Sequence, residues 1–349
     1  MITEGLYQSG VLRAFHSFSH RYEVEADARG GRCLRKVRRA KYVVLGYHRV
    51  GTGGVPFYCT LEQKVFAEQM QYIKRHYRVL SVKQMAEELK DPGARGQGVV
   101  VTFDDGYVGT FTEAFPLLQK YDIPATVYLT AGAIETGEIA WYDRIFLRFQ
   151  RAGSYLRLAL DTPREFRLSS YAARIDAAAE VVTYLRSVSD EQRLRWCAKF
   201  EEAIPLGAED LRGAMMSWQQ VRAMHQAGVS FGAHTMTHPV ASRLRPEVLK
   251  QEVCESKRLI EDRLTDSVAD FAFPFGKPQD CGTVGAAFLQ PLGFRTALTT
   301  IVGVNTSGAD AFRLRRMNIG GDCTVATFAL ALQSLFFSSW DEESVATEA

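Results

Sequence analysis

Hydrophobic and polar positions alternate in blocks along most of this chain. Runs rich in β-branched and aromatic residues predict buried strands at 42–50, 79–80, 99–103, 125–130, 229–234, 270–274 and 295–299. Apolar residues at helical spacing predict helices between them, at 61–75, 81–89, 111–121, 218–227, 246–264, 282–292 and 324–336. Such alternation is typical of α/β proteins, in which helices cover a closed or open parallel sheet.

The alternation is interrupted between residues 135 and 217. This stretch contains a helix that opens at Trp141, a strand pair around 156–168, and amphipathic helices at 175–186 and 191–204. A loop of this length without internal structure would be improbable. We therefore interpret 135–217 as a helical insertion on the rim of a main domain that spans 41–325.

Both ends of the chain differ from the main domain. Residues 1–40 combine apolar positions at helical spacing with a run of arginines and lysines. Such a lead-in can pack on the main domain as a helix, or lie on an anionic membrane surface. Residues 326–349 are expected to form a closing helix and an acidic tail.

The composition is that of a water-soluble globular protein, with 46% hydrophobic and 23% charged residues. A formal charge of +2 gives no reason to expect a nucleic-acid partner. The six cysteines include no Cys-x-x-Cys pair. Neither a secretory signal nor an apolar run long enough to span a bilayer is present, so the expected location is the cytoplasm, with membrane association through residues 1–40 as an option. The sequence does not indicate an oligomeric state.

The run Val99-Val100-Val101-Thr102-Phe103 ends in Asp104-Asp105-Gly106. Parallel strands present their carboxyl ends to the crevice where α/β proteins keep their chemistry. Adjacent side chains on an extended chain point to opposite sides, so one aspartate can bind a metal while the other acts as a base. Asp-Asp-Gly is also a good turn sequence, which is the alternative interpretation.

A second group follows the predicted strand 229–234. His234 and His238 are four residues apart, and on a helical turn they would face the same side. With Asp105 they would form a two-histidine, one-carboxylate set that leaves coordination positions open for water and substrate. The third stretch, 271–276, ends in Phe273-Pro274-Phe275-Gly276, and predicts a strand that runs into a tight turn whose backbone N–H groups face the crevice.

Together these stretches resemble the polysaccharide deacetylases of carbohydrate esterase family 4, the NodB homology group. Thr102-Phe103-Asp104-Asp105-Gly106 is similar to the first motif of that family, and His234-Thr235-Met236-Thr237-His238 to its His-(Ser/Thr)-x-x-His motif. Phe273-Pro274-Phe275-Gly276 is similar to the end of its Arg-x-Pro-(Tyr/Phe) motif. The likeness runs from about 41 to about 320, and Tyr47-His48-Arg49-Val50 with the insertion resembles a subgroup associated with extracellular polysaccharide genes.

The resemblance implies a distorted (β/α)7 barrel and metal-dependent removal of acetyl groups from N-acetylhexosamine units of a glycan. By this reading Asp105, His234 and His238 bind a divalent ion, which is most simply Zn²⁺, with Co²⁺, Ni²⁺ and Mn²⁺ as alternatives. Asp104 is the general base and the Phe275 N–H stabilises the oxyanion. Tyr107, Trp141 and Pro274 are expected to contact the N-acetylated glycan. Which glycan it is, and whether it is lipid-linked, is not encoded in these motifs.

The chain departs from the family pattern twice. Ala272 stands where the motif arginine orients the catalytic aspartate, and no histidine follows His238 to act as the general acid. His48, at the end of the first strand, is the candidate substitute. These departures keep a catalytically impaired, glycan-binding member of the fold as an alternative, alongside a hydrolase of other non-peptide C–N bonds. A magnesium-dependent phosphoryl-transfer enzyme is disfavoured by the two histidines and by the absence of a Walker-type loop.

Overall fold

The computed structural model describes residues 40–51, 60–158 and 163–337. Its strands are β1 (Lys41–Tyr47), β2 (Arg49–Val50), β3 (Thr60–Leu61), β4 (Arg78–Leu80), β5 (Gln97–Phe103), β6 (Ala125–Leu129), β7 (Tyr155–Leu158), β8 (Arg164–Arg167), β9 (Ser230–Ala233), β10 (Asp270–Ala272), β11 (Thr296–Leu298), β12 (Asn305–Thr306) and β13 (Met317–Asn318). The predicted lead-in 1–40 and the end of the predicted tail lie outside the described residues, apart from residue 40.

The helices alternate with these strands. They are α3 (Gln63–His76), α4 (Val82–Glu88), a π-helical turn η1 (Thr110–Ala114) that continues into α5 (Phe115–Tyr121), α6 (Ala131–Thr136), α7 (Trp141–Arg151), α8 (Tyr171–Ser187), α9 (Asp190–Ala203), α10 (Ala208–Leu211), α11 (Trp218–Gln226), η2 (Ala241–Arg243), α12 (Pro246–Leu264), α13 (Pro278–Cys281), α14 (Ala286–Leu289), η3 (Gln290–Leu292) and α15 (Val325–Phe337). No helix in the described ranges combines the length and the apolar character needed to cross a membrane.

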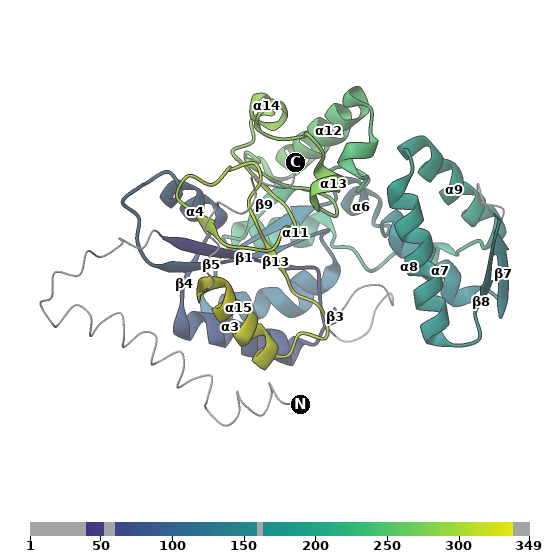
Figure 1. The fold of residues 1–349 in the computed structure, drawn as a ribbon, viewed down its shortest axis with the longest axis horizontal. Coiled ribbons are helices and arrows are strands. Elements are labelled where there is room, and N and C mark those ends of the chain that lie inside the picture. The colour runs from purple at the N-terminus through teal and green to yellow at the C-terminus, as the bar shows by residue number, and fades with distance from the viewer. Residues whose placement is uncertain (1–39, 52–59, 159–162, 338–349) are drawn as a thin grey trace, which may run out of the picture.

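One curled sheet of nine strands organises the main domain. Its order is β11-β10-β9-β6-β5-β1-β12, with β4 beside β5 and β13 beside β1. Among the described strands of this sheet, only β12 is antiparallel to its neighbour. Helices α3 and α15 lie below the curled sheet in Figure 1 and α12 and α14 above it, and all four pack into one hydrophobic core on the same face of the sheet. The predicted α/β fold is confirmed, and the curled sheet is consistent with a (β/α)7 barrel of the NodB type.

The central strands β5 and β1 run in parallel from Lys41 beside Gln97 to Tyr47 beside Phe103. The β-branched run 99–101 is buried on both faces, which is typical of parallel strands covered by helices. Because β6, β9 and β10 are also parallel, the carboxyl ends of all these strands lie at the same edge of the sheet.

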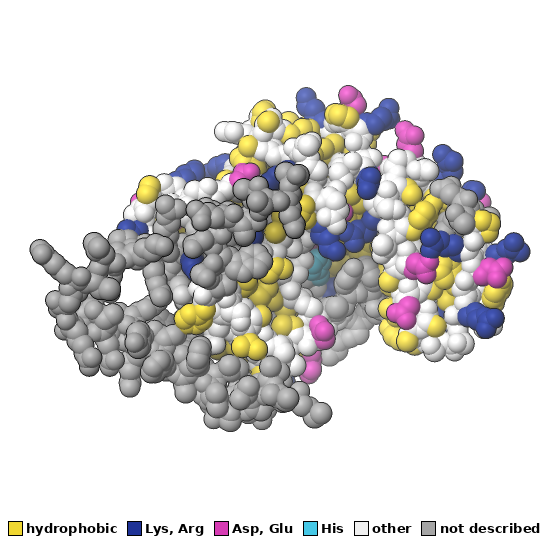
Figure 2. All heavy atoms as spheres, in the orientation of Figure 1, with side chains coloured by type: hydrophobic (Ala, Val, Ile, Leu, Met, Phe, Trp, Pro, Cys, Tyr) yellow, Lys and Arg dark blue, Asp and Glu magenta, His cyan; other side chains and the backbone are white. Residues whose placement is uncertain are grey.

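The segment between α6 and α11 forms a body of its own beside the main domain (Figure 1). Helices α7, α8 and α9 and the β7–β8 hairpin bury a separate hydrophobic cluster that includes Phe146, Phe149 and Phe200. The surface is hollowed between this insertion and the main domain, and a histidine side chain is visible there (Figure 2).

Two local predictions are wrong. The expected helix 282–292 is present only as α14 and η3, because Gly282, which follows α13, adopts φ +56° and Gly285 an extended conformation before α14. The expected first strand 42–50 is interrupted at His48, which joins β1 to β2. At both breaks the backbone leaves the regular helix or strand conformation. Hydrophobic periodicity does not predict such local changes of backbone conformation.

Candidate functional site

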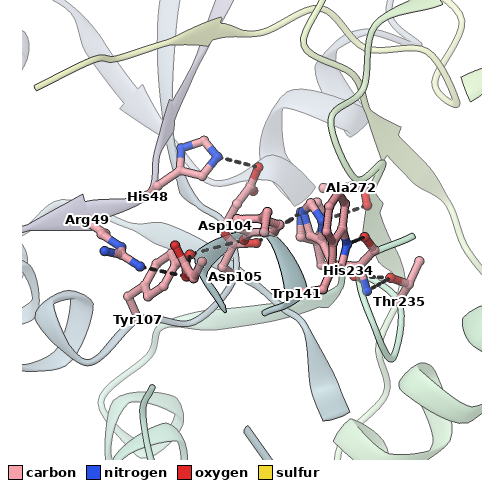
Figure 3. A network of polar contacts seen from close by, with 12 residues as sticks. His48, Arg49, Asp104, Asp105, Tyr107, Trp141, His234, Thr235 and Ala272 are labelled. Atoms are coloured by element: carbon pink, nitrogen blue, oxygen red, sulfur yellow. Dashed lines mark hydrogen bonds and ion pairs between the residues drawn. The ribbon is translucent and has the colours of Figure 1, made fainter. Parts of the chain in front are cut away.

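The candidate site lies at the carboxyl edge of the sheet, where four strands end. His48 follows β1, Asp104 and Asp105 follow β5, His234 follows β9, and the turn at Phe275 follows β10. Figure 3 shows that the side chains of His48, Asp104, Asp105 and His234 converge there. The predicted meeting of the early carboxylates with the later imidazoles is therefore confirmed.

Asp105, His234 and His238 form a buried cluster whose ligand atoms all lie within 4.8 Å of one another. Asp105 Oδ1 is 3.6 Å from His234 Nε2 and 3.4 Å from His238 Nε2. Ligands about 2.0–2.1 Å from a tetrahedral ion are roughly 3.3–3.4 Å apart, so these separations fit a shared metal. Asp105 Oδ1 is also buried without a hydrogen-bond partner in the described part of the chain. A divalent cation would satisfy it, and the donor set is that of a catalytic rather than a structural site.

The candidate metal-binding loop, which runs from His234 to His238, is not the helical turn that its spacing predicts. Thr235 and His238 adopt left-handed backbone conformations, with φ of +65° and +57°, which a helix does not allow. Thr235 Oγ1 accepts a hydrogen bond from His238 N at 3.1 Å and so stabilises the turn. Both imidazoles face Asp105 because the loop bends back on itself, and local strain of this kind is common at functional sites.

Glu252 on α12 holds the same loop from outside. Its Oε2 accepts hydrogen bonds from the backbone N–H groups of Met236 and Thr237, both at 2.9 Å, and its Oε1 accepts one from the Thr237 hydroxyl at 2.7 Å. The N–H groups of Ala131 and Gly132 in α6 donate to the carbonyls of Thr235 and Met236. The backbone between the two histidines is thus held by two helices, α6 and α12.

The orientation of His234 is set by a backbone carbonyl. Its Nδ1 lies 2.7 Å from the Ala272 oxygen, which can only accept a hydrogen bond, so Nδ1 carries the proton. Nε2 then keeps its lone pair and can bind a metal ion. Burial lowers the pKa of His234, which also favours the neutral form that binds a cation.

Asp104 is held by an arginine that the motif analysis missed. Arg316 Nη1 and Nη2 donate to Asp104 Oδ1 and Oδ2, each at 2.7 Å, and both side chains are buried. Ala272 does remove the motif arginine, but the chain supplies a guanidinium from the segment before β13. The signal in the sequence was a pair of arginines, 315 and 316, between the apolar residues Leu314 and Met317.

The pKa values of the two aspartates are shifted in opposite directions. Burial alone would raise the pKa of Asp104, but the positive charge of Arg316 and its hydrogen bonds hold that pKa well below its usual range. Burial raises the pKa of Asp105 to about 8, and the negative charges of Asp104 and Asp143 add to this effect. Asp104 is therefore ionised near neutral pH, whereas Asp105 needs a bound cation to release its proton readily.

His48 lies beside Asp104 at the edge of the site. Its Nε2 is 3.8 Å from Asp104 Oδ2, and 32% of its side chain is exposed. Burial lowers the pKa of His48 to about 4. The negative charge of Asp104 raises this pKa, and the positive charge of Arg316 cancels part of that increase. His48 is the one of the site's three histidines that reaches the solvent appreciably.

The turn after β10 brings the Phe275 backbone to the site. Phe275 adopts φ +60°, an unusual conformation for a bulky residue, and its ring packs against that of His238 with centroids 4.8 Å apart. No described residue accepts a hydrogen bond from its N–H group, whereas its carbonyl accepts one from the Thr300 hydroxyl. The predicted glycan-contacting residues Tyr107, Trp141 and Pro274 are all buried, and glycan contact stays a prediction for them.

The chain is similar to known proteins in sequence and in fold. The family model for polysaccharide deacetylase matches residues 92–287, which is more than half of the chain. The protein YxkH of Bacillus subtilis (strain 168) is 19% identical over 304 residues, covering 86% of this chain and 80% of its own.

Two solved structures share the fold. The deacetylase PplD of Streptococcus pyogenes, in complex with acetate, superposes with a TM-score of 0.56 at 20% identity, covering 85% of this chain and 99% of its own. IcaB from Ammonifex degensii superposes with a TM-score of 0.54 at 18% identity, covering 85% of this chain and 100% of its own. At these identities the likeness establishes the fold.

Proposed function

Because this chain belongs to the polysaccharide deacetylase family, we propose that it hydrolyses the N-acetyl groups of N-acetylhexosamine units in a polysaccharide or oligosaccharide, with a bound divalent metal ion. Membership of this family makes it a hydrolase of carbon–nitrogen bonds other than peptide bonds. The hexosamine substrate and the use of Zn²⁺ go beyond that membership. Two imidazoles and one carboxylate favour zinc, cobalt, nickel or manganese over magnesium.

The observation that carries this proposal is that two adjacent carboxyl groups at the end of one strand have pKa values shifted in opposite directions. Asp105 faces the imidazoles of His234 and His238, and Asp104 faces Arg316. A divalent ion held by Asp105, His234 and His238 would polarise the amide carbonyl and lower the pKa of a water molecule. Asp104 is ionised and adjacent, and can take the proton of the attacking water as the general base.

His48 can carry that proton onward. Its pKa, although lowered to about 4, is above that of Asp104, so a proton taken up by Asp104 is more stable on the imidazole. The separation of 3.8 Å between Nε2 and Oδ2 is short enough for transfer after a small movement or through one water. We propose that His48 then protonates the departing amine, the step for which this chain has no later histidine.

The Phe275 N–H group is our candidate for stabilising the oxyanion. The strained turn presents this donor without a competing acceptor among the described residues. Loss of one preorganised oxyanion donor typically costs about 3–4 kcal/mol of transition-state stabilisation. The turn is held in place by the hydrogen bond from the Thr300 hydroxyl to the Phe275 carbonyl.

The test is acetate release from N-acetylated chito-oligomers by the zinc-loaded protein and by Asp104→Asn. Asparagine keeps the size of the side chain but cannot act as a base, so we expect activity to fall about 10²- to 10⁴-fold with the zinc content unchanged. Removing zinc with a chelator should abolish activity in the wild type, and adding zinc back should restore it.

Full activity of Asp104→Asn would contradict the assignment of the base. If the wild type binds these oligomers and zinc but releases no acetate from any hexosamine oligomer, the alternative of a glycan-binding member of the fold is supported instead. A screen of small N-acetylated compounds distinguishes the third interpretation, a hydrolase of other C–N bonds.

A further inference from the structure

The first turn of helix α7, in the insertion, reaches three different parts of the candidate metal site. Trp141, Tyr142 and Asp143 are consecutive, and at most 8% of any of these side chains is exposed. Asp105, by contrast, comes from the main domain, at the end of β5. The insertion therefore contributes to the interior of the site as well as to its rim.

Trp141 and Tyr142 both contact His238. The indole Nε1 of Trp141 donates a hydrogen bond to the His238 carbonyl at 3.0 Å. The Tyr142 ring packs edge-on against the imidazole, with centroids 4.9 Å apart. Within the described residues His238 Nδ1 has no hydrogen-bond partner, unlike Nδ1 of His234. The orientation of His238 therefore depends on its backbone and on the rings packed around it.

Tyr142 also reaches the third metal ligand. Its side chain is hydrogen-bonded to Asp105, an interaction that lowers the pKa of that carboxyl group and opposes the effect of burial. Asp105 Oδ1 faces the two imidazoles and has no hydrogen-bond partner in the described ranges, so it stays available for the ion. The contact with Tyr142 limits rotation of the carboxylate.

Asp143 fixes the turn to the main domain. Its Oδ2 accepts hydrogen bonds from Arg49 Nη2 at 2.8 Å and from the Tyr107 hydroxyl at 2.7 Å. The Tyr107 and Tyr142 hydroxyls are 3.1 Å apart, and the Arg49 guanidinium lies 3.9 Å above the Tyr107 ring. Arg49 follows His48 in the chain and lies beside Tyr107 (Figure 3), so its buried ion pair with Asp143 connects the insertion to the strand end that carries His48.

We infer that the first turn of α7 is the outer support of the metal site, with Trp141 and Tyr142 as positioning residues for His238 and Asp105, and with the Arg49–Asp143 ion pair holding that turn in register. This inference rests on the metal site of the proposed function, but not on deacetylation. Its consequence is that the insertion is required for metal affinity even though the three ligands lie outside it.

The experiment compares zinc affinity, measured by competition with a chromophoric chelator, in the wild type and in Tyr142→Phe. The substitution removes one hydroxyl and keeps the ring against His238. Loss of such an outer contact typically weakens metal binding about 10- to 100-fold, and we expect a decrease of about tenfold. The matched control is Tyr171→Phe, which removes a hydroxyl from an exposed tyrosine of the same insertion and should leave the affinity unchanged.

A second variant, Asp143→Asn, tests the ion pair. We expect weaker zinc binding, and we expect the double variant with Tyr142→Phe to lose less than the product of the two single effects, because both act on Asp105 through one network. The absorption spectrum of the Co²⁺-substituted protein should change in both single variants, which a purely structural role would not cause.

Zinc affinity within twofold of wild type in Tyr142→Phe would overturn the inference. So would a loss of affinity that is matched by an equal loss in Tyr171→Phe. Urea unfolding of the metal-free proteins separates a folding defect from a binding defect, and Tyr142→Phe provides the decisive result if Asp143→Asn does not fold. Acetate release is measured separately, so wild-type protein that binds zinc without deacetylating would contradict the proposed function alone.

Discussion

Arg316 and Asp104 form a bidentate ion pair across 212 residues of sequence, with both hydrogen bonds at 2.7 Å. Asp104 follows β5 and Arg316 precedes β13, and both strands pair with β1, from opposite sides. The register of the sheet therefore brings the two residues together. The guanidinium enters from a segment late in the chain and takes the place of the motif arginine lost at Ala272.

We predict that Arg316→Lys lowers the turnover number while changing the KM only slightly. Lysine keeps the charge but cannot bind both carboxylate oxygens in the planar geometry of a guanidinium. The pKa of Asp104 should rise, because Arg316 is the main cause of its depression. Since the base must be ionised, the acidic limb of the kcat/KM profile should move to higher pH.

The neighbouring arginine provides the control for this variant. The backbone of Arg315 is hydrogen-bonded to the Asn305 side chain, and its charged group makes no ion pair with Asp104 in the structure. Arg315→Lys should leave the pH profile in place. An acidic limb that stays at the wild-type pH in Arg316→Lys would mean that the pair does not set the charge state of the base.

Glu252 gives a prediction about the metal-binding loop. Glu252→Ala removes three hydrogen bonds from the backbone and side chain between His234 and His238, and we expect zinc affinity to fall about 10- to 100-fold. Glu252→Gln should retain most of the affinity. Its amide oxygen can accept from both N–H groups, and its NH₂ group can donate to the Thr237 hydroxyl.

The same helix offers a matched control, since Glu255 is exposed one turn further along α12. Glu255→Ala should bind zinc like the wild type. Normal zinc binding by Glu252→Ala would reject the explanation by loop positioning. So would a loss of zinc affinity in Glu252→Gln as large as that in Glu252→Ala.

The sequence predicted which strand ends meet at the candidate site, but not how the loops that follow them are built. Asp104, Asp105 and His234 could be placed because a strand end is visible in hydrophobic periodicity. The left-handed turn at Thr235 and His238 could not, because it depends on contacts with Glu252 and α6 that are distant in sequence.

Arg316 and Asp143 were missed for a related physical reason. Each is a charged residue in a segment that gives no motif, and only burial beside an opposite charge gives it a role. Ion pairing of this kind depends on tertiary contacts, since a buried charge without its partner would be strongly unfavourable. Hydrophobic periodicity predicts the segment in which such a residue lies, but its ion-pair partner is determined by the tertiary fold.

The last prediction concerns the stability of the metal-free protein between about pH 7 and pH 8. The pKa of Asp105 is raised to about 8, chiefly by burial, whereas an unfolded aspartate titrates near ~3.9. In this window the folded state therefore holds a proton that the unfolded state has already lost. Stability falls as pH rises wherever the unfolded state binds fewer protons, so Asp105 should make the metal-free protein less stable at about pH 8 than at pH 7.

The neighbouring histidines act in the opposite direction at lower pH. The pKa values of His234 and His238 are lowered by burial. The stability of the folded state that depends on them therefore increases with pH, and this increase is nearly complete by about pH 7. Urea unfolding of the metal-free wild type and of Asp105→Asn isolates the carboxylate. Between pH 7 and pH 8 the unfolding free energy of the wild type should fall by about 1 kcal/mol relative to that of Asp105→Asn.

Zinc should reverse the trend, because the ion binds the ionised carboxylate and competes with its proton. Zinc-loaded protein is then expected to gain stability over the same window in which the metal-free protein loses it, while Asp105→Asn shows neither slope. Parallel slopes for the metal-free wild type and Asp105→Asn would show that Asp105 is already ionised at neutral pH. In that case the environment formed by Asp104, Asp143 and burial would not control the charge of the metal ligand.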